Sequence, residues 1–121
     1  SFDLGRDEAS RVLWLDAYVA NVDRSARNTN LLIWHKRLWA IDHGACLRFH
    51  HAWGSPEAFA GAGYRFGDHV LDGRGDPRTA HEELAALISH EALEMIMKQV
   101  PDEWLEPDPK RPDPQAPVDA V

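Results

Sequence analysis

A polar segment at residues 21–30 separates two apolar stretches of different periodicity, and this contrast constrains the fold more than any other feature. Before the segment, apolar residues recur at alternating three- and four-residue spacing, at Val12, Leu15, Val19 and Val22. This spacing predicts an amphipathic helix over residues 7 to about 20, with Asp7 available to cap its first turn. After the segment, residues 31–34 and 38–42 flank a basic turn, which predicts a two-stranded hairpin. The polar segment is therefore expected to be a loop that joins a helix end to a hairpin.

This loop and the end of the hairpin carry two carboxylates and two amides in a fixed order. Asp23 is followed by Asn28 and Asn30, and Asp42 closes the second strand, two residues before Gly44. Phosphoryl transfer requires hard oxygen ligands for Mg²⁺ and one carboxylate that holds the attacking hydroxyl. The order therefore predicts Asp23 as the catalytic residue, with Asp42 and one asparagine as metal ligands.

The same residues resemble the HipA-like kinases, and more narrowly the smaller group called HipA family kinases. The matching stretches are Asn21-Val22-Asp23-Arg24, residues 28–35, residues 38–44 and Phe49-His50-His51. The resemblance covers roughly residues 10 to 105. It implies that Asp23 is the catalytic aspartate, Asp42 the metal-binding aspartate, and Asn28 or Asn30 the metal-binding asparagine. It also implies the C-terminal lobe of a protein-kinase-like fold, ATP and Mg²⁺ as cofactors, and a hydroxyl-bearing substrate, either a protein Ser/Thr or a small molecule.

Three assignments in this region have alternatives. Asn28 has the spacing from Asp23 that kinase catalytic loops show, whereas Asn30 directly precedes a strand. We favour Asn30 because the strand fixes the direction of the ligand and a loop absorbs two extra residues easily. Arg24 is a candidate contact for the phosphates of the cofactor, with an ordinary surface position as the alternative. His43 is a candidate for cofactor binding and for orienting the site, with structural hydrogen bonding as the alternative.

The sequence shows no nucleotide-gripping lobe ahead of the loop. A glycine-rich phosphate loop and a lysine-bearing strand are both missing before Asp23, which only 22 residues precede. Such a lobe needs on the order of a hundred residues. We therefore expect residues 1–105 to be the catalytic C-lobe alone, with a kinase as the parent protein and little transfer from this chain by itself. Its exposed lobe-interface surface is expected to allow a dimer.

The remaining sequence predicts a mainly α fold with a small β-hairpin. Ser55-Pro56-Glu57 signals a short helix, and Thr79 with Glu82 forms a capping box for one long helix that continues to about Gln99. One more helical turn is expected at residues 101–104, with Trp104 and Leu105 closing the core. Trp14, Trp34 and Trp39 are likewise expected in the core or at the lobe interface. Residues 106–121 hold five prolines and predict a disordered tail.

Composition excludes several classes of function. The formal net charge of −7 argues against binding of nucleic acid. No apolar run approaches the ~20 residues of a membrane span, and no signal-like segment opens the chain. Because Cys46 is the single cysteine, no internal disulfide forms, and a cytoplasmic location is expected. A metal-dependent phosphoesterase and a non-catalytic kinase lobe that serves as an interaction module are the alternative functions.

Overall fold

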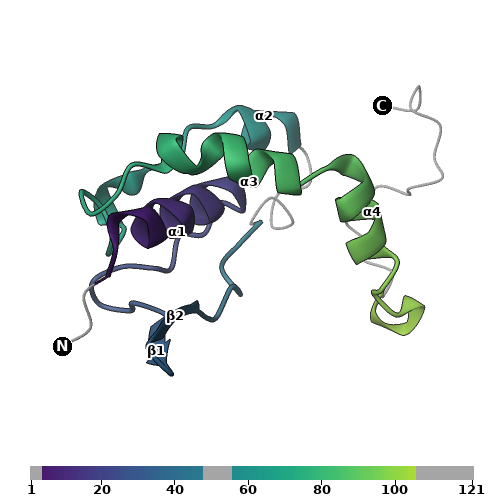
Figure 1. Ribbon diagram of the computed structural model, residues 1–121. Coiled ribbons are helices and arrows are strands. Elements are labelled where there is room, and N and C mark those ends of the chain that lie inside the picture. The colour runs from purple at the N-terminus through teal and green to yellow at the C-terminus, as the bar shows by residue number, and fades with distance from the viewer. Residues whose placement is uncertain (1–3, 48–55, 106–121) are drawn as a thin grey trace.

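The computed structural model describes residues 4–47 and 56–105 (Figure 1). Its helices are α1 (Arg6–Tyr18), α2 (Pro56–Gly61), α3 (His81–Leu87) and α4 (His90–Met97). Strands β1 (Leu31–Trp34) and β2 (Arg37–Ala40) form one antiparallel hairpin. Single 3₁₀ turns are η2 (Phe66–Asp68), η3 (Pro77–Ala80) and η4 (Asp102–Trp104). The predicted class, mainly helical with a small hairpin, is confirmed, as are the helix that precedes the polar segment, the short helix after Ser55 and the helical turn near Trp104.

Helix α1 is the element on which the core is built. Ala9 and Leu13 are buried against Leu71, and Val12 and Phe66 pack around them. The helix begins at Arg6, so Asp7 lies within the first turn, where its charge favours the helix N-terminus, and makes no cap hydrogen bond. The buried face also includes Ser10 and Asp16, whereas the predicted core position Val22 is exposed. The apolar spacing therefore identified the helix but not the face that it buries.

The segment before η3 crosses α1 closely because the residues at the contact are small, Ser10 on the helix and Gly75 in the segment. The Ser10 hydroxyl accepts a hydrogen bond from the Asp76 backbone N–H at 2.9 Å and donates to the Arg6 carbonyl at 2.8 Å. A Cβ atom added to Gly75 would lie 2.6 Å from the backbone nitrogen of Ser10. Gly75 therefore fits where a side chain would collide with backbone.

Helix α3 lies beside α1 (Figure 1) and is joined to it by polar contacts. Trp14 donates its indole N–H to Nδ1 of His81 at 3.0 Å, and Arg11 pairs with Glu83 at 3.1 Å. The predicted single helix from Thr79 to Gln99 is wrong, because the chain forms η3, α3 and α4 in succession. Ile88 leaves helical geometry and the Ser89 side chain caps α4 by accepting from the Ala92 N–H.

The predicted capping box is also wrong. Asp76, three residues earlier than Thr79, is the N-cap of η3 and accepts from the backbone N–H of Arg78. The Thr79 hydroxyl instead donates to the Asp76 carbonyl at 2.7 Å. An Asp side chain that precedes a proline readily accepts hydrogen bonds from the exposed N–H groups of a first helical turn, and for this reason the helical structure starts earlier than predicted.

The hairpin pairs Leu31 with Ala40 and Trp34 with Arg37. His35 and Lys36 form its two-residue turn, and both have positive φ angles, 49° and 60°. That geometry is typical of tight hairpin turns. The second strand ends at Ala40, two residues before the predicted end, so Asp42 lies beyond the ladder. A two-stranded hairpin is marginally stable alone, so its placement depends on the loop beside it.

Many large apolar side chains of this chain face solvent. Trp104 is 75% exposed, and Trp34, Trp39 and Leu105 are exposed as well, so the expectation that these residues pack in the core of this chain is wrong. A role at a lobe interface, and a dimer formed there, stay predictions. None of the helices within the described ranges is both long and apolar enough to cross a membrane. Residues 49–51 and the proline-rich segment 106–121 lie outside the described residues.

Candidate functional site

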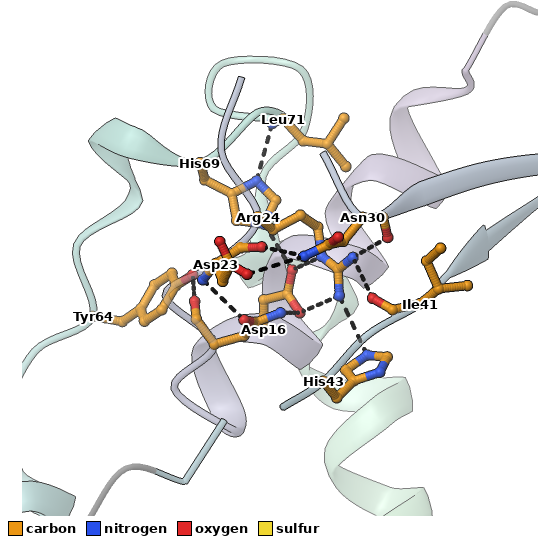
Figure 2. A network of polar contacts seen from close by, with 10 residues as sticks. Asp16, Asp23, Arg24, Asn30, Ile41, His43, Tyr64, His69 and Leu71 are labelled. Carbon is orange, nitrogen blue, oxygen red and sulfur yellow. Dashed lines mark hydrogen bonds and ion pairs between the residues drawn. The ribbon is translucent and has the colours of Figure 1, made fainter. Parts of the chain in front are cut away.

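A buried polar cluster lies directly beneath the loop at residues 21–30 (Figure 2). Asp16, from α1, is fully buried, and Arg24 is 2% exposed. The Asp16 carboxylate accepts hydrogen bonds from Arg24 Nε at 2.5 Å and from Arg24 Nη2 at 3.2 Å. It also accepts from Asn21 Nδ2 at 3.1 Å. The buried guanidinium and carboxylate thus form a two-point ion pair, the arrangement that gives Arg its geometric specificity.

His69 completes the set of donors to Asp16. The backbone N–H of Leu71 donates to His69 Nδ1 at 3.0 Å, so the ring proton of a neutral imidazole is on Nε2. Nε2 lies 2.8 Å from Oδ2 of Asp16 and donates to it. The backbone of residues 69–71 therefore fixes the tautomer that serves the carboxylate.

The surroundings keep Asp16 ionised. Burial by itself would raise the pKa of Asp16, but hydrogen bonds from His69, Arg24 and Asn21, together with the charge of Arg24, hold this pKa below its ordinary value. Tyr64 lies at the edge of the same cluster and donates its hydroxyl to the Asn21 carbonyl at 2.5 Å. Burial and the negative charge of Asp16 raise the pKa of Tyr64 to about 12, so its hydroxyl stays protonated.

Arg24 also reaches past Asp16 to the other side of the loop. Its Nη1 donates to the carbonyl of Asn30 and, at 3.3 Å, to the carbonyl of Ile41. Its Nη2 lies 3.3 Å from Nε2 of His43, which accepts the hydrogen bond. The guanidinium is therefore enclosed by protein groups, and this places Arg24 under the site rather than at a surface open to phosphate.

Both candidate asparagines point their amide groups at Asp23. Asn28 Nδ2 donates to Asp23 Oδ2 at 3.0 Å. Asn30 Nδ2 donates to the Asp23 carbonyl at 2.6 Å and lies 3.4 Å from Asp23 Oδ2. Within the described part of the chain, neither amide oxygen accepts a hydrogen bond. The loop thus brings Asp23, Asn28 and Asn30 together, and both asparagines remain candidates for the metal ligand.

Asp42 follows Ile41, which pairs with Asn30 at the end of the hairpin. The Ile41 N–H donates to the Asn30 carbonyl at 2.9 Å, so Asp42 follows the last hydrogen-bonded pair by one residue. Asn30 and Asp42 both have left-handed backbone angles, with φ of 47° and 53°. Asn and Asp tolerate this conformation better than other side-chain-bearing residues, and such backbone strain is enriched at functional sites. The Asp42 carboxylate is exposed and accepts the Gly44 N–H at 3.3 Å, whereas the His43 side chain lies at the surface beside Arg24.

The donor types suit Mg²⁺. A carboxylate such as that of Asp42 and an amide oxygen are ligands that this ion takes, and it keeps several waters besides them. Because the amide nitrogens of Asn28 and Asn30 are turned toward Asp23, their oxygens are left for a cation. Among residues 4–47 and 56–105, no cluster of three or more His, Cys, Asp or Glu side chains is arranged for a metal. A tetrahedral zinc-type site is therefore not seen in these ranges, whereas a magnesium site with an amide ligand needs no such cluster.

Sequence reasoning missed the buried layer formed by Asp16, Asn21 and His69, with the half-buried Tyr64 at its edge. The one signal available was Asp16 itself, a charged residue three positions after Leu13 on the same helix. Comparison of the chain with protein-family models, with curated proteins and with solved structures finds no match. The functional proposal therefore rests on the geometry of these residues and on the motifs that they form.

Proposed function

We propose that this chain is the catalytic lobe of an ATP- and Mg²⁺-dependent kinase of HipA-like type, which transfers the γ-phosphate to a hydroxyl of a protein or small molecule. The observation that supports this most is the convergence on Asp23. Two asparagine amides donate to this residue, and the neighbouring Arg24 binds Ile41 and His43, the residues on either side of Asp42. Arg24 thus links the loop that carries Asp23 to the residues on either side of Asp42, and this link supports the assignment of the three groups to one phosphotransfer site.

The proposal gives each residue one role. Asp23 accepts a hydrogen bond from the acceptor hydroxyl and holds it in line with the phosphate. Asp42 and either Asn30 or Asn28 hold Mg²⁺, which when bound neutralises charge that develops on the transferred group. His43 orients the segment that contains Asp42, through its hydrogen bond with Arg24. In this proposal ATP is gripped by a further lobe, because neither a glycine-rich phosphate loop nor a lysine-bearing strand precedes Asp23 in this sequence.

The decisive experiment measures γ-phosphate transfer by the full-length parent protein with Asp23→Asn and Asp42→Asn beside the wild type. Each change keeps the size of the side chain and removes its charge. We expect each variant to lose transfer by about a hundredfold or more. Asp72→Asn is the matched control, since Asp72 is exposed and only its backbone N–H makes a hydrogen bond within the described residues.

Other outcomes point to the alternatives. Undiminished transfer in both variants contradicts the assignment of the site. Metal-dependent phosphate release without ATP indicates a phosphoesterase. A parent protein whose melting temperature is unchanged by ATP and Mg²⁺ indicates a lobe kept for interaction only.

A further inference from the structure

The geometry points to Arg24 as the positioning residue that sets Asp42 relative to Asp23, with buried Asp16 as its anchor. This inference rests on the proposed function, because it concerns the placement of the proposed metal ligand Asp42 relative to the proposed catalytic residue Asp23. Arg24 has a positioning role because its guanidinium lies on the buried side of the loop, away from solvent. It acts through the Asn30 carbonyl, and through the Ile41 carbonyl and the His43 ring on either side of Asp42.

The guanidinium joins three segments that are separate in sequence. Nε and Nη2 bind the Asp16 carboxylate on α1, and Nη1 binds the carbonyl of Asn30 at the end of the loop. Nη1 and Nη2 also bind the Ile41 carbonyl and the His43 ring (Figure 2). Asp23 immediately precedes Arg24 and Asp42 lies between Ile41 and His43. The planar guanidinium of Arg24 therefore holds the residues next to Asp23 and Asp42 at a fixed separation.

The anchor at the other end is rigid. Asp16 extends from α1, the helix whose Ala9 and Leu13 form the core with Leu71. His69 and Asn21 occupy further lone pairs of its carboxylate, so the acceptor cannot rotate away from Arg24 without losing hydrogen bonds. Displacement of the guanidinium thus requires the buried cluster to rearrange.

Besides Arg24, the hairpin region is held by Leu31, which packs against the core, and by the Leu47 N–H, which donates to the Val19 carbonyl at 2.8 Å. Most side chains of β1 and β2 are exposed, with only Leu31, Leu38 and Ala40 partly buried. Within the described residues, the direct bonds from the loop to residues 41–43 are the Arg24 contacts and the Ile41 N–H to Asn30 carbonyl hydrogen bond. The separation of Asp23 and Asp42 therefore depends on the fork of Arg24 more than on packing of the hairpin.

Arg24→Lys is the sharpest test. A lysine keeps a positive charge beside Asp16, but one ammonium group cannot reproduce the planar fork that reaches Asn30, Ile41 and His43 together. Arg27→Lys is the matched control because Arg27 lies exposed in the same loop. Asp16→Asn is the second variant, since it keeps the size of the anchor and removes its charge.

The readout is line broadening of backbone amide NMR signals when the 121-residue chain is titrated with Mn²⁺ alone. In the wild type and in Arg27→Lys, we expect residues 23–30 and 42–44 to broaden together with one midpoint. In Arg24→Lys and Asp16→Asn, we expect that midpoint to rise at least tenfold, or the two segments to broaden at different midpoints. Circular dichroism of α1 and the melting temperature identify any variant that is unfolded, in which case the other variant decides.

The two proposals fail in different ways. A folded Arg24→Lys or Asp16→Asn variant with the common midpoint within twofold of the wild type overturns the positioning role and leaves the metal site standing. Absence of Mn²⁺ broadening at both segments in the wild type, or broadening there that Asp42→Asn leaves unchanged, overturns the proposed metal site and this inference with it.

Discussion

Nε2 of His69 lies 2.8 Å from Oδ2 of Asp16, although 53 residues separate them in the sequence. This bond ties the segment after η2 to the last turn of α1, directly under the loop that carries Asp23. The same segment lies against the loop, since the Val70 N–H donates to the Arg24 carbonyl at 2.9 Å and Ser25 forms an isolated antiparallel bridge with His69. The loop is thus held from below by α1 and from the side by residues 69–70.

The contribution of this bond to stability can be measured. We expect His69→Ala to lower the free energy of unfolding by about 1.5–3 kcal/mol, because a hydrogen bond to a buried carboxylate is lost and a cavity is left. Urea denaturation followed by circular dichroism checks this. His90→Ala is the control, since His90 is exposed on α4 and a change there should stay within about 0.5 kcal/mol. Equal effects of the two substitutions would contradict the role of His69.

Asp16 should make stability depend on acid pH. Its pKa is lowered in the folded chain from an ordinary value of 3.8, so its charged form is favoured by folding. The contribution is therefore fully present above pH 3.8 and is lost as the pH falls through the lower, folded value. We expect the urea midpoint of the wild type to drop below about pH 4, and Asp16→Asn to be less stable at pH 7 but less sensitive to acid.

Asp76 provides the comparison for this acid effect. The pKa of Asp76 is also lowered, mainly by side-chain and backbone hydrogen bonds from Arg78, but the pair lies at the surface and is screened by solvent. Asp76→Asn should thus leave most of the acid sensitivity in place. If Asp76→Asn abolishes it and Asp16→Asn does not, the buried cluster is not its source.

The crossing of α1 by the segment before η3 yields a third prediction. Gly75→Ala should cost about 1–3 kcal/mol, because the added methyl group would collide with the Ser10 backbone. Gly67→Ala is the matched control, since a Cβ atom there meets no atom within 4 Å and the glycine has no positive φ. Thermal unfolding of both variants checks this difference. Equal melting temperatures would show that the crossing is looser than described.

The sequence predicted the local elements well and the buried polar layer poorly. Helical periodicity around Leu13 and the strand pattern around Trp39 are local signals, and both elements form. Asp16 and Arg24 are residue types that are seldom fully buried, so an exposed position is the natural expectation for each. Their burial depends on His69, which no spacing rule connects to them. The break between α3 and α4 was missed for a related reason, because Ser89 was not recognised as a helix cap.

The two asparagines can be separated by matched substitutions to glycine. Asn30→Gly removes the amide and adds no backbone strain, because glycine adopts the left-handed conformation of this position, where alanine would be strained. The Asn30 amide donates to the Asp23 carbonyl and the strand that follows fixes its direction, whereas Asn28 is exposed in the loop. In the proposed transfer reaction, we expect Asn30→Gly to raise the Mg²⁺ concentration for half-maximal transfer at least about tenfold. We expect a much smaller rise for Asn28→Gly. The opposite order of the two effects would assign the metal to Asn28, and the five-residue spacing from Asp23 would then be the feature that decides the ligand.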